Sequence, residues 1–140
     1  MVDPIFTRGP GMTPSVLRLV RYAMLAGVLL FGGFAYYQST HRVPLPADDG
    51  AGANLPMLRW VGLGLCVAAI FGMALLRQAR ERADVATRPN LSLIGSALGE
   101  AAALFGGVYM LLGGDISIYA LAVVIFLATW TFLPADSESA

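Results

Sequence analysis

The chain has 140 residues, of which 57% are hydrophobic and 13% are charged, and its mean hydropathy is +0.70. Soluble domains average about 25% charged residues, so this composition excludes a disordered chain and argues against a water-soluble globule. Nine arginines balance nine acidic residues, and a chain without a basic excess is not expected to bind nucleic acid. We therefore expect a single integral membrane domain that has the lipid bilayer as its main partner.

Four apolar segments predict four transmembrane helices, because a spanning helix needs roughly 20 apolar residues. The first segment follows Thr13-Pro14, a capping hydroxyl and a proline that suit the start of a helix. The predicted fold is all-α, an antiparallel bundle of four transmembrane helices. The expected helices cover residues 15–37, 57–78, 91–113 and 116–134.

The three connections differ in length and character. Residues 38–56 contain prolines, glycines and aspartates, which predict an irregular external loop. Residues 79–90 are charged and predict a cytoplasmic loop, and the charged segment from residue 77 is expected to continue the second helix for a turn or two. The third connection, Gly113-Gly114-Asp115, is a tight turn that makes the last two helices antiparallel neighbours, with Asp115 as the expected cap.

The arginines predict the orientation of the bundle. Seven of them precede or begin the first helix or lie in the second connection, and two lie toward the other side. Because positive residues stay in the cytoplasm, both termini should be inside (N-in/C-in), in the inner membrane of a bacterial cell. In an alternative interpretation the first segment is a cleaved signal peptide, which would leave three helices. The residues expected to anchor helix ends at the membrane interface are Arg18, Arg21, Arg59, Trp60, Arg77 and Trp130.

Glu100 is the most informative residue, because it lies near the middle of the third apolar segment. An ionised carboxylate there is costly, so Glu100 should be protonated, paired or facing a hydrated cavity. Ser96 lies one helical turn away and is the second candidate ion-binding residue. Small residues at every fourth position predict a helix-packing ridge beside Glu100, formed by Gly95, Gly99, Ala103 and Gly107.

Two interpretations of Glu100 remain open. In the functional one, the carboxyl titrates on a path for protons or cations. In the structural one, a protonated Glu100 hydrogen-bonds across a helix interface, or an ionised one pairs with an arginine. The candidate hydroxyl partners are Ser96, Thr129 and Thr131.

Residues 93–106, with the sequence LIGSALGEAAALFG, resemble the ion-carrying helix of the rotary ATPase proteolipids, the c subunits. That family has the pattern A-L-x-E-A-x-A-aromatic-G around the carboxylate that binds H⁺ or Na⁺. The resemblance implies that Glu100 is an ion carrier. The four-helix proteolipids carry their acid in the last helix, whereas the last segment here contains none. The residues at or within one position of the pattern are Ala97, Leu98, Glu100, Ala101, Ala103, Phe105 and Gly106.

Enzyme signatures are missing from the sequence, which has no nucleophile elbow, phosphate-binding loop, paired histidines or CxxC. A lone carboxylate without a base, metal or nucleophile makes no catalytic site. We therefore expect no enzyme, no metal and no cofactor. The predicted function is a structural or accessory role in which the chain packs against other membrane subunits or copies of itself. The alternatives are proton or cation translocation through Glu100 and a small-molecule transporter built as a dimer of bundles.

Overall fold

The computed structural model describes residues 13–41, 54–84 and 87–134. Within them every regular element is a helix and no strand is present, so the predicted all-α architecture with four helices is confirmed. The expected external loop at 38–56 lies mostly outside the described residues, as do Arg8 and Arg42. The helices are α1 (Pro14–Thr40), α2 (Leu55–Arg82), α3 (Arg88–Leu111) and α4 (Ser117–Phe132).

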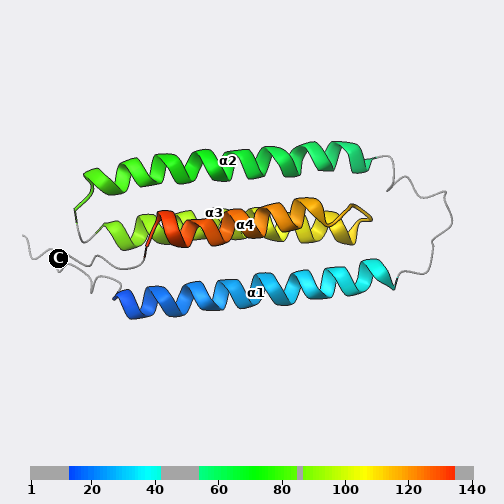
Figure 1. The fold of residues 1–140 in the computed structure, drawn as a ribbon, viewed down its shortest axis with the longest axis horizontal. Helices are drawn as coiled ribbons and strands as arrows, with labels where there is room; N and C mark the ends of the chain where they lie inside the picture. The colour runs from blue at the N-terminus through cyan, green and yellow to red at the C-terminus, as the bar shows by residue number, and fades with distance from the viewer. Residues whose placement is uncertain (1–12, 42–53, 85–86, 135–140) are drawn as a thin grey trace, which may run out of the picture.

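The helices alternate in direction along the chain (Figure 1). As a result, the start of α1, the connection between α2 and α3, and the end of α4 lie at one end of the molecule. α3 is the central element and packs against each of the other three helices, while α1 and α2 lie on opposite sides of the α3–α4 pair (Figure 1). In its most apolar stretch α3 therefore buries 44% of its residues, against 22% for α1 and for α2.

α1, α2 and α3 are long and apolar enough to cross a membrane, but α4 is shorter than the segment predicted at 116–134. Its 16 residues rise about 24 Å, against about 30 Å for a hydrocarbon core. α4 ends at Phe132 because Pro134 disfavours the helical conformation at Leu133. The Leu133 side chain packs instead over Gly95 of α3, where an added Cβ would overlap its Cδ1.

α1 and α2 extend beyond their predicted bounds, whereas α3 begins earlier than predicted, at Arg88, and also ends earlier, at Leu111 instead of residue 113. α1 continues to Thr40, where the hydroxyls of Ser39 and Thr40 donate to backbone carbonyls one turn earlier. α2 continues to Arg82, and Arg77 and Glu81 form an exposed ion pair along it at 3.7 Å. Because α3 already begins at Arg88, the cytoplasmic loop expected at 79–90 is shorter than predicted.

The backbones of α3 and α4 lie in direct contact. A Cβ on Gly99 would lie 2.9 Å from the Cα of Phe126, and a Cβ on Gly106 would lie 2.7 Å from the Cα of Tyr119. The two contacts are seven residues apart on each helix and run in opposite directions, as in an antiparallel heptad seam. Glycine at these two positions therefore sets the distance between the two helices.

Candidate functional site

The four residues of the predicted ridge are all buried, and they serve more than one interface. Gly99 faces Phe126 of α4, and Gly95 faces Leu133, which directly follows α4. Gly107 instead faces α1, where an added Cβ would lie 2.6 Å from Cε1 of Phe31. The ridge thus packs α3 against two helices at once.

Glu100 is half-buried near the middle of α3. It stands two turns before Gly107, which packs against Phe31 of α1, and one turn after the buried Ser96. Within the described residues its carboxylate makes no hydrogen bond or ion pair. The structure therefore leaves the one carboxyl of the predicted membrane segments without a polar partner in that part of the chain.

The hydroxyls that the sequence offered as partners of Glu100 are engaged elsewhere. A hydroxyl has a single proton to donate, and each of these donates to a carbonyl of its own helix. The hydrogen bonds run from Ser96 to Ser92 at 3.1 Å, from Thr129 to Phe126 at 2.6 Å and from Thr131 to Ala128 at 2.8 Å. Ser96 and Glu100 share one face of α3 but are not joined by a hydrogen bond.

Arg21 is the most buried charged group of the described residues, with 4% of its surface exposed. Its Nη2 donates to the carbonyl of Leu133, just after α4, and to the carbonyl of Ser92 in α3 at 3.4 Å. Carbonyls at a helix C-terminus carry partial negative charge, which a guanidinium offsets. Arg21 therefore joins α1, α3 and α4 at one end of the bundle.

The sequence assigned Arg21 to the membrane interface, and the structure places it inside the bundle. One signal could have indicated this position. Arg21 stands seven residues before Val28 and fourteen before Ala35, both fully buried, so all three share one face of α1. The carbonyl groups that it reaches are distant in sequence, and no local pattern predicts them.

The remaining predicted anchors divide into two groups. Trp130 is half-buried and packs edge-on against Tyr22 of α1, with ring centroids 5.2 Å apart. The others have exposed side chains, as residues at the headgroup level would: Arg18, Arg59, Trp60 and Arg77. Arg77 also lies over the ring of Phe132, 5.7 Å from its centroid, and so connects α2 to α4.

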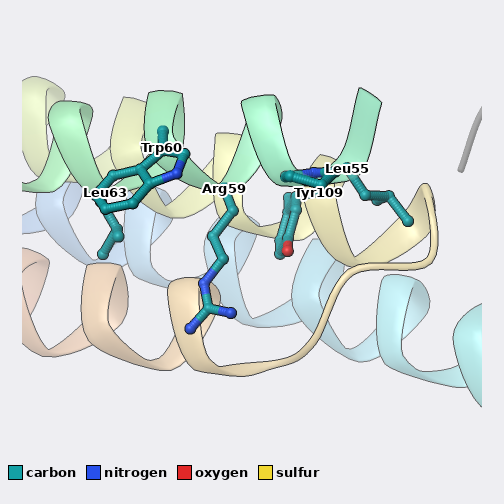
Figure 2. Close-up of a pocket in the computed structure, with 6 residues that line it drawn as sticks. Leu55, Arg59, Trp60, Leu63 and Tyr109 are labelled. Carbon is teal, nitrogen blue, oxygen red and sulfur yellow. The ribbon is translucent and has the colours of Figure 1, made fainter. Parts of the chain in front are cut away.

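A cavity of about 480 Å³ opens beside the first turns of α2 (Figure 2). Its lining contains one cation and two aromatic rings, one of which carries a phenolic hydroxyl, and so offers a surface for binding. Nearby, hydrogen bonds from Ser117 hold the pKa of Asp115 below its ordinary value, and the charge of Arg59 adds to this effect. The cavity is lined by Leu55, Pro56, Arg59, Trp60, Leu63 and Tyr109.

Comparisons of the chain with protein-family models, with curated proteins and with solved structures gave no match. The resemblance of residues 93–106 to the proteolipid helix therefore stays a prediction from the sequence. Within the described residues, no three side chains of His, Cys, Asp or Glu gather as a metal site would require.

Proposed function

We propose that this chain is a small multi-pass membrane protein with an accessory role, which packs through its outer helices against other membrane subunits or copies of itself. Three helices of spanning length and apolarity support the membrane placement. α1 and α2 bury little of their apolar surface inside the bundle. In a bilayer, this surface is available to lipid and to neighbouring helices.

The observation that carries the proposal is a pair of glycines that face outward. A Cβ added to Gly27 of α1 or to Gly64 of α2 would meet no atom within 4 Å. Each stands four residues from an exposed alanine, Ala23 in α1 and Ala68 in α2. A glycine and an alanine four residues apart on one face let the backbone of a second membrane helix approach closely. On α3 small residues at this spacing, Gly95 and Gly99, pack against other parts of the bundle, whereas those on α1 and α2 face outward, away from the other described helices.

The test is the native mass of the complex extracted gently from its own membrane, with every chain in it identified. We expect an assembly heavier than one copy. Gly27→Leu and Gly64→Leu should lower that mass, because the added side chains meet nothing inside the bundle and hinder only an outer contact. Ala79→Leu, an exposed substitution on α2 beyond the apolar span, is the matched control. A wild-type protein that runs as a lone monomer contradicts the proposal.

The orientation belongs to the same proposal, with both termini inside and the bacterial inner membrane as the location. The arginines of the described chain support it, because most of them lie near the end of the bundle where α1 and α3 begin and α2 ends. Positive residues are retained on the cytoplasmic side.

A second candidate function is proton or cation translocation through Glu100. The observation that favours it is the half-buried carboxylate near the middle of α3, which has no hydrogen-bond partner within the described residues. Glu100→Gln keeps the shape and removes the titrating group, whereas Glu100→Asp keeps the acid. We expect the Gln variant to abolish proton flux in vesicles and the Asp variant to retain part of it. Equal flux in the wild type and the Gln variant contradicts this function.

A further inference from the structure

Three arginines gather where the end of α2 meets the start of α3. They line a pocket of about 340 Å³, which we call the basic pocket, together with one carboxylate and one aromatic ring. Three guanidinium groups and one carboxylate give the pocket a formal charge of +2. The basic pocket is lined by Arg77, Arg80, Glu81, Arg88 and Phe132.

The arginines are held near one another even though their charges repel. Arg80 and Arg88 line the same pocket, so two guanidinium groups come together where α2 ends and α3 begins. Arg88 is fixed by a hydrogen bond from its Nε to the carbonyl of Ala83 at 3.3 Å. In the part of the chain that the structure describes, Glu81 pairs with Arg77, and no carboxylate pairs with Arg80. The repulsion within the pocket is therefore incompletely neutralised by this part of the chain.

A second, apolar pocket of about 210 Å³ adjoins the basic one, and we call it the apolar groove. It shares Arg77 and Phe132 with the basic pocket, so the two pockets lie on either side of these residues, between α2 and α4. Its far end, at Ile70, lies seven residues before Arg77, or about 10 Å along the helix axis. The apolar groove is lined by Ile70, Met73, Ala74, Arg77 and Phe132.

We propose that the two adjoining pockets bind one anionic phospholipid, with its phosphate in the basic pocket and an acyl chain in the apolar groove. Arginine presents paired donors that match phosphate oxygens, and basic pockets at the cytoplasmic ends of membrane helices attract anionic headgroups. The adjoining groove distinguishes a lipid from a free anion, because a soluble phosphate has nothing to place there. The inference rests on the membrane placement made under the proposed function.

The test uses the full chain, purified in detergent and titrated with dioleoyl-phosphatidylglycerol or dioleoyl-phosphatidylcholine, with bound lipid counted by native mass spectrometry. We expect one tightly bound phosphatidylglycerol and no equivalent phosphatidylcholine. The double variant Arg80→Gln with Arg88→Gln should weaken phosphatidylglycerol binding by about tenfold or more, since each arginine near an anionic headgroup contributes roughly 1 kcal/mol. Arg82→Gln, an exposed arginine outside the pocket, should change it less than about threefold.

A second variant separates the groove from the charges. Ala74→Phe fills the apolar groove without altering any charge, and we expect it to weaken phosphatidylglycerol binding also. Equal binding of the two lipids, or equal losses from the Arg80/Arg88 and Arg82 variants, overturns the inference in favour of diffuse attraction. Competition by inorganic phosphate at similar concentration overturns it in favour of a soluble-anion site. These results do not depend on how many protein chains the complex contains, which tests the proposed function, and the placement in the bilayer is tested separately by flotation with membranes.

Discussion

At Gly99 and Gly106, the absence of a side chain determines how closely α3 and α4 pack. An alanine at either position would place its Cβ against the backbone of α4, which cannot move without separating the helices. We expect Gly99→Ala and Gly106→Ala each to lower the free energy of unfolding by about 1–3 kcal/mol. Gly64→Ala, where the added Cβ meets nothing, should be neutral or stabilising by up to about 1 kcal/mol. Denaturant titration in detergent measures the free energy of unfolding of each variant. Equal effects of Gly99→Ala and Gly64→Ala would contradict the close backbone contact between α3 and α4.

Arg21 carries the second prediction at the scale of single residues. Arg21→Met keeps most of the side-chain volume but removes the donors to the carbonyls of Ser92 and Leu133. Because these are charge-assisted bonds in a buried site, we expect a loss of about 1.5–3 kcal/mol in the free energy of unfolding. Arg82→Met, at an exposed position, should cost less than about 0.5 kcal/mol. Similar unfolding midpoints for both variants would show that Arg21 acts only as a lipid-facing anchor.

At the scale of elements, Asp115 sets the start of α4. Its Oδ1 accepts hydrogen bonds from the backbone N–H of Ser117 at 3.0 Å and from the Ser117 hydroxyl, and these bonds lower the pKa of Asp115. A lowered native pKa means that the stabilisation is fully present above the unfolded value of about 3.9 and is lost as pH falls through the native value. We therefore expect the wild type to be more stable than Asp115→Ala at about pH 6, with the gap closing toward about pH 2.5. A gap that stays constant with pH in unfolding experiments would exclude this role.

The sequence predicted each helix, because a long apolar run in this chain can satisfy its backbone only as a helix. It predicted the helix ends less well. Polar residues near the end of α1, such as Thr40, still continue the helix, while Pro134 shortens α4. The spacing of small residues at every fourth position did predict the helix-packing ridge that contains Gly99. The sequence did not predict the burial of Arg21 or the proximity of Arg80 to Arg88, because both depend on which helix ends are brought together in space.

At the scale of the whole molecule, the alternating helices predict which ends share a membrane side. In a Cys66→Ala background, His41→Cys should react with an impermeant maleimide in intact cells. Ala83→Cys and Pro134→Cys should react only after the membrane is opened, because the structure places them at the opposite end. Pro134→Cys also tests whether the short α4 crosses the bilayer. Labelling of this variant in intact cells would show that α4 does not cross as proposed.

The most direct test of the central claim, that the outer helix faces contact other chains in the membrane, is photocrosslinking in intact membranes. A photoreactive phenylalanine analogue would replace Phe71, an exposed ring two turns after Gly64 on the same face of α2, and in a matched variant Ala79. The account predicts an adduct of this chain with a second protein chain from the Phe71 position and little from the Ala79 position. Adducts with lipid alone at Phe71 would show that this face meets only the bilayer, and would contradict the accessory role.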